Sequence, residues 1–568
     1  MTDHPHLKNN SLIFTRWLQI ISFFIVAVSI ALPRMLDLGR FVTTDEPLWL
    51  YRSANFLTAL KTGRWEQTYQ SPHPGVTTMW AGVAGLVVSY PGYLHAATDI
   101  MNYGQYERFM LDTARVTPLK VLIASRMFIV LLTTFTLIMA FWFAARLFGW
   151  MPAFIAFLLI AFDPFHLALT RVLHLDGLLS GFLLLSLLSY ICFWREKSYL
   201  ALFISGAGAG LAWLTKSPGL FIFPFIGLLT VIIFLDDQRR HPSYQLKKAI
   251  LKTAQIYFLW VFSAALISFL VWPALTVNPR YVLRRVLFTS VEMAQAGHEH
   301  ALFYRGQIFP TGQIGLDHFD YYGVNFLWRT TPIVLIGLAL LVGFWVYKTY
   351  LLRQGGTDVV IISLSLFFFG FLIFMSFGEK KFDRYILPVF PVADILSAVG
   401  YGVWVEFWRT KTDSMKLRSL SLVFVAIALL FQFTDVLRIA PYYHAYYNSL
   451  MGGPKRAPLW MQIGWGEGLD LAAEYLNQKP DAEKLVVYSW YGGGCFSYYF
   501  HGKTRYIPAV RETKKMGESL RKSDYIVVYV NQIQRNLGKF TLEFVKEKTP
   551  EARIYINGIE YVRIYAVR

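Results

Sequence analysis

Cysteine is nearly absent from this chain of 568 residues, which contains only Cys192 and Cys495. Cys192 lies in an apolar run and Cys495 in a distant polar region, so we expect neither a disulfide bond nor a cysteine metal cluster. Charged residues are also scarce, at 16% of the sequence, whereas a soluble globular chain carries about a quarter. This scarcity argues against an ordinary soluble protein.

Acidic residues are the rarer of the two signs of charge. Asp and Glu number 36 against 54 Lys and Arg, which gives a formal net charge of +18. Such an excess suits anionic lipids and phosphates. No RNA- or DNA-binding motif accompanies it, so we expect membrane lipids as partners and no nucleic acid.

Apolar residues are abundant instead, at 55% of the sequence, with 47 Phe, 33 Tyr and 17 Trp that suit aromatic belts at two membrane interfaces. The mean hydropathy is +0.41. Eleven apolar segments of near-spanning length are predicted to cross a membrane. They are 12–32, 119–148, 151–169, 175–194, 199–214, 219–235, 249–273, 326–348, 358–377, 384–407 and 417–437.

The first apolar segment, 12–32, is too long for a signal peptide and ends in Leu32-Pro33-Arg34 without a small-x-small cleavage pattern. We therefore expect an uncleaved anchor. A polar excursion over 34–118 follows it.

Basic residues predict the orientation of the spans. With the N-terminus in the cytoplasm, the loops after spans 4, 6, 8 and 10 all lie inside, and all are basic, as the positive-inside rule requires. These loops contain Arg195/Lys197, Arg239/Arg240/Lys247/Lys248, Lys348/Arg353 and Arg409/Lys411/Lys416/Arg418. The excursion 34–118, the loop 274–325 and the C-terminal region then lie outside, and the plasma (inner) membrane is the expected location.

Long apolar runs stop at residue 438. Leu469–Leu476 reads as an amphipathic helix, and 484–489, 525–530, 553–556 and 561–566 read as strands, the last two joined by an Asn557-Gly558 turn. The predicted fold class is an all-α polytopic membrane protein over 1–437 with a small extracytoplasmic α/β domain over 438–568.

An adjacent acidic pair, Asp45-Glu46, follows the first span by about a dozen residues. Carboxylates beside a membrane face are costly unless they are solvated, paired or used. Asp45 before Pro47 also suits a helix cap, and capping and catalysis can coexist. His73, between Pro72 and Pro74, either faces a substrate or forms a turn into the apolar segment 76–90.

Basic residues recur on the same predicted face. Arg171 lies five residues before Asp176, so it either binds phosphate or pairs with that carboxylate. Lys216 interrupts an apolar region, as a snorkelling lysine at a helix end also would. Lys380, Lys381 and Arg384 break the positive-inside trend on a short outer loop, and an outer-leaflet phosphate would explain them.

In combination and order, these landmarks resemble the polyprenyl-phosphate-sugar-dependent glycosyltransferases that include protein O-mannosyltransferases and lipid A aminoarabinose transferases. The segments that carry the resemblance are Asp45-Glu46, His73-Pro74 (with Gly75 in place of a second proline), Arg171…Asp176, Leu214-Thr-Lys216, 381–388, 442–448 and 465–468. The loop 274–325 is too short for the β-trefoil domain of the eukaryotic O-mannosyltransferases, which argues against a protein acceptor.

The resemblance implies a GT-C-type enzyme with a lipid-linked donor and inversion at the anomeric carbon. We expect Asp45 to be the catalytic base, with Glu46 orienting the acceptor or the loop. We expect Arg171, Lys216 and Arg384 to converge on the leaving phosphate. The full set of expected substrate-binding residues is His73, Arg171, Asp176, Lys216, Lys380, Lys381, Arg384 and Tyr385.

Other readings stay open at this level. No cofactor is required, although Asp45, Glu46, His73 and Asp176 could together hold a divalent ion. A transporter or flippase would also place ionisable residues in membrane segments, and a non-catalytic scaffold could present the C-terminal domain. The sugar and the acceptor, which can be a glycan, a lipid or a protein, are not specified by the sequence.

Overall fold

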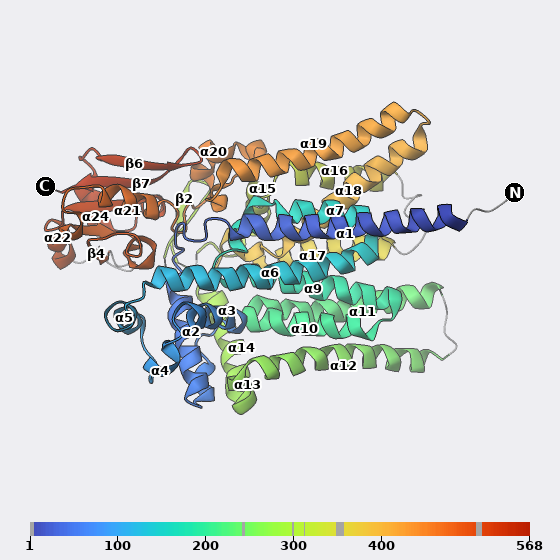
Figure 1. Cartoon of the computed structure of the whole chain (residues 1–568), viewed down its shortest axis with the longest axis horizontal. Coiled ribbons are helices and arrows are strands. Elements are labelled where there is room, and N and C mark those ends of the chain that lie inside the picture. Colours follow the sequence, from blue (N-terminus) through green and yellow to red (C-terminus); the bar gives the residue numbers. More distant parts are fainter. Residues whose placement is uncertain are drawn as a thin grey trace.

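The computed structural model describes residues 5–240, 245–297, 300–311, 313–347, 357–506 and 514–567. A helical bundle forms most of the molecule, and a small sheet domain caps one end of it (Figure 1). The first helix begins at the opposite end (Figure 1). This arrangement confirms the predicted fold class, an integral membrane protein with a small C-terminal α/β domain.

Among the described residues, eight helices are long and apolar enough to cross a membrane. They are α1 (Pro5–Met35), α6 (Pro118–Phe148), α9 (Leu175–Glu196), α11 (Ile222–Arg240), α12 (Leu246–Val271), α17 (Thr357–Ser376), α18 (Val389–Lys411) and α19 (Met415–Ile439). A bent pair, α15 (Tyr321–Arg329) and α16 (Pro332–Tyr347), raises the number to nine if it forms one span.

The structure therefore modifies three of the eleven expected spans. The segment 151–169 contains two helices, α7 (Trp150–Ala161) and α8 (Pro164–Leu169), because Asp163 caps the second one by accepting from His166 N (2.7 Å). The segment 199–214 forms α10 (Tyr199–Thr215), which is 17 residues long. The segment 326–348 is bent by 112° between Arg329 and Pro332.

Burial separates the central helix from the peripheral ones. In α9, 94% of the apolar window is buried inside the protein, against 17% in α1 and 28% in α12 and α19. The peripheral helices therefore present their apolar side chains to lipid. The small residue Gly85 lets another helix, α3 (Val76–Ser89), approach α6, since a Cβ there would lie 2.3 Å from Ser125 N.

The polar excursion 34–118 folds at the same end of the bundle as the sheet domain (Figure 1). Its other helices are α2 (Glu46–Lys61), α4 (Tyr93–Ala96) and α5 (Tyr103–Arg108). Two further helices lie at this end, α13 (Pro273–Val277) and α14 (Pro279–Ala296). Loops that are separated in the sequence thus meet above the bundle.

The C-terminal sheet has the strand order β4-β3-β5-β7-β6, parallel from β4 to β5 and antiparallel from β5 to β6. Its strands are β3 (Val486–Ser489), β4 (Lys503–Tyr506), β5 (Tyr525–Tyr529), β6 (Ala552–Ile556) and β7 (Ile559–Ala566). Its helices are α20 (Gly453–Trp460), α21 (Leu469–Asn477), α22 (Lys514–Leu520), α23 (Val530–Gln534) and α24 (Lys539–Val545). A separate hairpin joins β1 (Leu302–Tyr304) to β2 (Gln307–Phe309).

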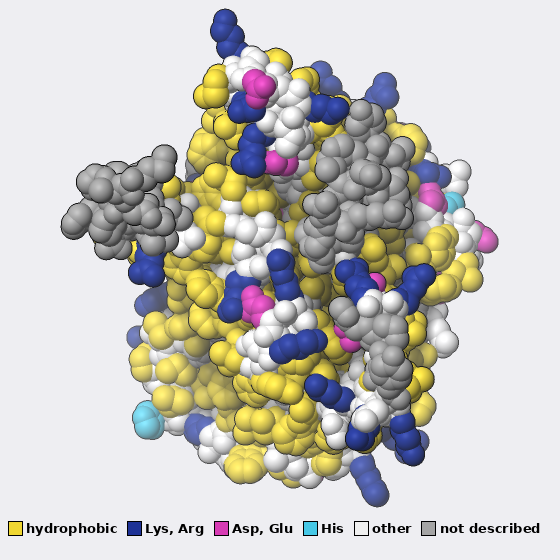
Figure 2. Space-filling model, turned by 90° about the vertical axis from the view of Figure 1, so that its right-hand side faces the viewer, with side chains coloured by type: hydrophobic (Ala, Val, Ile, Leu, Met, Phe, Trp, Pro, Cys, Tyr) yellow, Lys and Arg dark blue, Asp and Glu magenta, His cyan; other side chains and the backbone are white. Residues whose placement is uncertain are grey.

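The end of the bundle away from the sheet domain carries many Lys and Arg side chains and fewer Asp and Glu (Figure 2). The ends of α9, α11, α18 and the start of α19 lie there (Figure 1), with the basic residues that the sequence placed on one side. The expected basic loop with Lys348 and Arg353 lies outside the described residues.

Candidate active site

Asp45 lies immediately before α2, where three distant segments of the chain meet. Its Oδ2 accepts hydrogen bonds from Arg384 Nη2 (3.2 Å) and from Trp465 Nε1 (3.2 Å), and it lies 3.4 Å from His174 Nε2. The side chain makes no capping hydrogen bond to α2. These three contacts are all to Oδ2, the side chain is 29% exposed, and Asp45 lines a cavity.

Asp176, at the start of α9, is the second carboxylate of the same network. It accepts a hydrogen bond from Lys216 Nζ (2.6 Å), and its Oδ2 lies 3.2 Å from His174 Nδ1 and 3.5 Å from Arg384 Nε. His174 and Arg384 therefore bridge the two acids. We call Asp45, His174, Asp176, Lys216 and Arg384 the central charge cluster.

Electrostatics keep Asp45 ionised. Burial opposes its charge, but the hydrogen bond from His174 and the positive charges of Arg384 and Lys216 outweigh burial and lower the pKa of Asp45 below its ordinary value. The pKa of His174 is raised, because attraction to Asp176 and Asp45 outweighs the opposing effect of burial. The cluster thus holds an ionised carboxylate next to a histidine that is more basic than usual.

Glu46 differs from Asp45 in its burial and in its hydrogen-bond partners. It is fully buried and accepts hydrogen bonds from Arg126 Nε (2.6 Å), Thr43 N (2.9 Å) and Leu173 N (2.8 Å). Arg126, on α6, also donates to the carbonyl of Phe41 (2.9 Å). Glu46 was expected among the catalytic residues; its place corresponds to the expected alternative, orientation of the loop that carries Asp45.

Arg171 does not join the central charge cluster. Its guanidinium donates to the carbonyl of Leu36 and lies 5.2 Å from the centre of the Tyr443 ring. In the described part of the chain it forms no ion pair with Asp176. Both expected roles, phosphate binding with Lys216 and a pair with Asp176, are therefore unsupported, because the short connection between α8 and α9 directs the two side chains to different partners.

The remaining expected residues divide between a cavity and a helix end. Lys381 is buried and donates to the carbonyls of Ser376 (2.7 Å) and Gly378 (2.9 Å), at the C-terminal end of α17. The ring of Tyr385 lies under Lys216, with Nζ 4.0 Å from its centre. His73 Nδ1 lies 3.0 Å from Ser217 Oγ. Lys381 therefore stabilises structure, whereas Tyr385 and His73 line a cavity.

The cavity lined by His73 and Tyr385 has a volume of about 680 Å³, and its lining is polar at one part and apolar at another. We call it the larger cavity. Its polar residues include His73, Lys216, Lys380 and Tyr385, together with the carboxylate of Glu379. Its apolar wall comes from the segment after Lys216, α14 and the end of α17, with Leu220, Leu287, Val291, Phe374, Met375 and Phe377. Burial and the charges of Lys216 and Lys380 lower the pKa of His73 to about 3, so its imidazole is neutral.

A smaller cavity of about 160 Å³ is lined by Asp45 and Arg384, whereas the next residue, Tyr385, lines the larger cavity. The walls of the smaller cavity include Asp383, Arg384, His444 and Trp465, together with Tyr491 of the C-terminal region. Buried pairs support these walls: Arg329 contacts Asp383 (2.6 Å) and His444 contacts Glu467 (2.5 Å). The active-site candidate therefore includes residues of the C-terminal region.

Sequence reasoning did not single out His174 and Trp465 as functional residues. Both lie in segments that carried the resemblance, His174 two residues before Asp176 and Trp465 in Trp465-Gly-Glu467. The signal was present, but only the tertiary contacts show that both side chains approach Asp45. Among the described residues no group of three or more His, Cys, Asp or Glu is arranged to hold a metal ion.

Comparison with known families gives one match. Residues 112–288 match the family model of dolichyl-phosphate-mannose-protein mannosyltransferases. This segment contains Arg126, His174, Asp176 and Lys216, and the match confirms the predicted resemblance to glycosyltransferases that use a polyprenyl-phosphate sugar. A comparison with curated protein sequences found no significant match.

Similar solved structures include ArnT from Cupriavidus metallidurans bound to undecaprenyl phosphate, at 14% identity and a TM-score of 0.46, covering 97% of this chain and 98% of that chain. The apo oligosaccharyltransferase of Archaeoglobus fulgidus is 12% identical with a TM-score of 0.47, covering 94% and 71%. The S. cerevisiae protein O-mannosyltransferase Pmt1-Pmt2 complex bound to the sugar donor is 17% identical with a TM-score of 0.36, covering 47% and 34%.

Proposed function

We propose that this chain is an inverting glycosyltransferase that moves a sugar from a polyprenyl-phosphate carrier to an acceptor hydroxyl. One observation carries the proposal: the central charge cluster lies between an apolar cavity with a cationic end and a smaller polar cavity that contains Asp45. The family match over residues 112–288 supports the same class of enzyme.

The larger cavity suits the donor. A polyprenyl chain is apolar and its phosphate is anionic, so the apolar wall would hold the isoprenoid units nearest the phosphate, and Lys216 and Lys380 would attract the phosphate. The neutral imidazole of His73 would donate a hydrogen bond to a phosphate oxygen through the nitrogen that does not face Ser217. Of the three cations expected to share the phosphate, Arg171 is replaced in this account by Lys380.

The smaller cavity suits the acceptor, because it contains the base. The acceptor hydroxyl oxygen forms a bond to the anomeric carbon while the bond from that carbon to the phosphate oxygen breaks. The bonding electron pair leaves with the phosphate oxygen, and the hydroxyl proton passes to the Asp45 carboxylate. Attack from the side opposite the leaving phosphate inverts the anomeric configuration.

The cations between the cavities would stabilise the charge that grows during the reaction. Lys216 and Arg384 both face Asp176, so in the resting enzyme their charges are partly balanced by a buried carboxylate. The leaving phosphate brings a further negative charge to the same place, and preorganised cations lower the barrier because they need no rearrangement. A metal ion is not required for a phosphate leaving group.

We further propose that the site lies on the outer face of the plasma (inner) membrane. The basic end of the bundle (Figure 2) would face the cytoplasm according to the positive-inside rule. The excursion 34–118 and the proposed C-terminal domain, 438–568, lie at the opposite end (Figure 1). Donor, acceptor and base would then meet outside the membrane.

The direct test uses the full chain in lipid nanodiscs with a panel of undecaprenyl-phosphate sugars and an envelope extract as the source of acceptors. We expect one donor to release undecaprenyl phosphate, and mass spectrometry to find a product heavier by that sugar with inverted configuration. If no donor is consumed, but vesicles containing the chain move a lipid-linked sugar between leaflets, the protein is a transporter and the proposal is wrong.

A further inference from the structure

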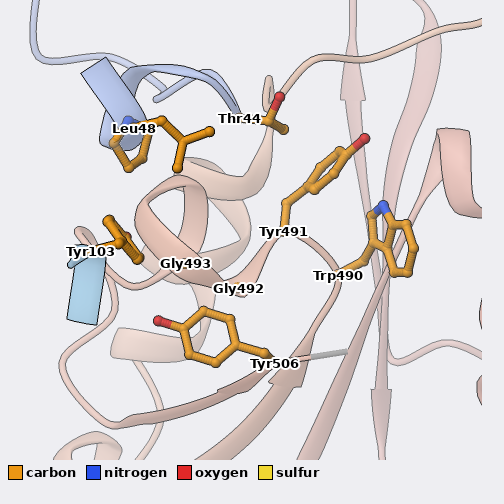
Figure 3. Close-up of a pocket in the computed structure, with 9 residues that line it drawn as sticks. Thr44, Leu48, Tyr103, Trp490, Tyr491, Gly492, Gly493 and Tyr506 are labelled. Carbon is orange, nitrogen blue, oxygen red and sulfur yellow. The ribbon is translucent and has the colours of Figure 1, made fainter. Parts of the chain in front are cut away.

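A small aromatic pocket lies where α2 and α5 meet the C-terminal region (Figure 3). It adjoins the smaller cavity that contains Asp45, which we call the acceptor cavity. The pocket has a volume of about 200 Å³. Tyr103 and Leu48 lie on one side of it and Trp490 and Tyr491 on the other, with Tyr506 from the edge strand β4 below them. Segments more than 380 positions apart in the sequence thus share one pocket. We call it the aromatic pocket.

The aromatic rings are held in place by specific contacts. The side chain of Asn531 accepts a hydrogen bond from Trp490 Nε1 (3.0 Å) and donates one to the Tyr491 hydroxyl (2.8 Å). The Tyr506 ring lies close over the backbone of Gly493, where an added Cβ would stand 2.6 Å from Cε1 of that ring. A pocket whose rings are fixed before binding loses little entropy on binding.

The aromatic pocket continues into the acceptor cavity. Thr44 and Tyr491 line both of them, and Thr44 is the residue directly before Asp45. Tyr491 has a left-handed backbone with φ of 52°, which is uncommon for a residue other than glycine. Strained residues of this kind often lie at binding sites. A molecule in the aromatic pocket would therefore extend directly toward the base.

The charge of the residues around the aromatic pocket indicates which class of molecule it can bind. None of the described residues that line the aromatic pocket is charged. Behind Tyr103, the carboxylate of Glu107 accepts the hydrogen bond of the Tyr103 hydroxyl (2.5 Å). A phosphorylated or carboxylated group placed here would find no cation among the described lining residues, so the aromatic pocket itself does not favour an anionic group.

We infer that the aromatic pocket is an acceptor subsite for a neutral sugar ring. A pyranose has an apolar C–H face that stacks on aromatic rings, and hydroxyls at its rim that bond to Tyr and Thr hydroxyls and to backbone groups. The volume is below the roughly 300–1,000 Å³ of sites for drug-sized ligands, and it suits one ring. The inference rests on the proposed function and specifies it: the acceptor is a neutral glycan whose terminal hydroxyl reaches Asp45.

Two substitutions change the pocket with little effect on the fold. Tyr506→Ala removes a ring that is 49% exposed. Gly493→Ala adds a methyl group that displaces this ring, at a backbone position with φ of −80° that any residue adopts. Tyr555→Ala is the matched control, because Tyr555 is 57% exposed on β6, the other edge strand of the same sheet.

Binding is measured by saturation-transfer NMR on the full chain in nanodiscs, with neutral trisaccharides, a phosphorylated lipid A and an unglycosylated Ser/Thr-rich peptide as probes. We expect a neutral trisaccharide to bind, and Tyr506→Ala and Gly493→Ala to weaken it roughly 3- to 10-fold, the effect of losing one aromatic contact. Tyr555→Ala should bind as the wild type does. In transfer assays the acceptor KM should rise in both pocket variants by more than the donor KM.

Other outcomes overturn the inference. If only the anionic lipid or only the peptide binds, the acceptor belongs to a different class. Equal binding of the trisaccharide by the wild type and both pocket variants would place the glycan elsewhere. The donor-release assay on the wild type distinguishes the two proposals: glycan binding that depends on Tyr506, without consumption of any donor, would leave the pocket in place and refute the glycosyltransferase.

Discussion

The two cavities beside the central charge cluster differ in size, lining and origin. The larger one is formed by membrane helices and their ends, and it combines an apolar wall with Lys216 and Lys380. The smaller one is formed by loops and the C-terminal region, and it contains Asp45 and Asp383. This difference is the basis of our proposal that the bundle would bind the lipid-linked donor, whereas the region above the bundle would select the acceptor.

The same contrast separates two adjacent carboxylates. Asp45 is partly exposed and has three donors on one oxygen, whereas Glu46 is buried and bonded to Arg126 and two backbone N–H groups. We therefore propose that Asp45 acts on the acceptor, whereas the contacts of Glu46 fix the loop. Substitutions of Asp45 and of Glu46, and of residues in each of the two cavities, can test these differences.

The largest effect is expected for Asp45→Asn. The asparagine keeps the size of the side chain and can still accept the hydrogen bonds of Arg384 and Trp465, but it cannot take a proton, so turnover should fall about 10²–10⁴-fold while donor affinity changes little. Release of polyprenyl phosphate and donor binding measure the two quantities. Asp37→Asn, at an exposed carboxylate of the same excursion, is the control. Turnover like that of the wild type would move the base to another residue.

Glu46→Gln should act on stability instead. It leaves the buried guanidinium of Arg126 without its opposite charge, and loss of one partner of a buried pair costs about 3–5 kcal/mol of the free energy of unfolding. The unfolding temperature in detergent measures this, and a double variant, Glu46→Leu with Arg126→Met, should recover part of the loss. A Glu46→Gln protein with unchanged stability and no turnover would instead make Glu46 catalytic.

Hydropathy predicted the helical segments well, because burial in lipid demands long apolar runs. It could not show that Asp163-Pro164 divides 151–169 into two helices, or that the chain bends after Arg329. Short runs rich in β-branched and aromatic residues predicted β3 and β5, and the Asn557-Gly558 turn predicted the β6–β7 hairpin. The short, polar β4, Lys-Thr-Arg-Tyr, carries no such signal, and it joins the sheet through its parallel pairing with β3.

The sequence predicted some residues of the candidate site and missed others, for a physical reason. Asp45, Asp176, Lys216 and Arg384 are charges beside or at the ends of apolar segments, where an unused charge is costly, so the sequence singled them out. Arg171 has the same signal, but the direction of a side chain on a five-residue connection is set by packing. His174 and Trp465 are common in structural roles, and only their contacts with Asp45 distinguish them.

Lys216→Met and Arg384→Met test the donor side of the contrast. Each removes a cation that faces the buried Asp176 and the proposed phosphate, so donor affinity should fall roughly 10- to 100-fold, the range for hydrogen bonds to charged groups. The double variant should lose less than the product of the two effects, because the residues share Asp176. Arg171→Met, measured on folded protein, should bind the donor within about twofold of the wild type, since its guanidinium lies outside the cluster. An equal loss in Arg171→Met would restore the three-cation phosphate site.

The smallest effect concerns pH and the link between the two sides. The pKa of His174 is raised in the folded protein, because attraction to Asp176 and Asp45 outweighs burial. The stabilisation from its positive charge is therefore complete below the unfolded pKa of about 6.5 and is lost as the pH rises through the higher folded value. The unfolding temperature of the wild type should thus decrease from pH 6 toward pH 9 more than that of His174→Asn, which has no charge to lose.

The two acids also lose the group that bridges them, so the acceptor KM of the wild type should increase over the same interval, whereas that of the variant should already be high at pH 6. Parallel stability curves for the two proteins would mean that His174 is neutral in the folded state, and the bridge between the donor and acceptor sides would then consist of Arg384 alone.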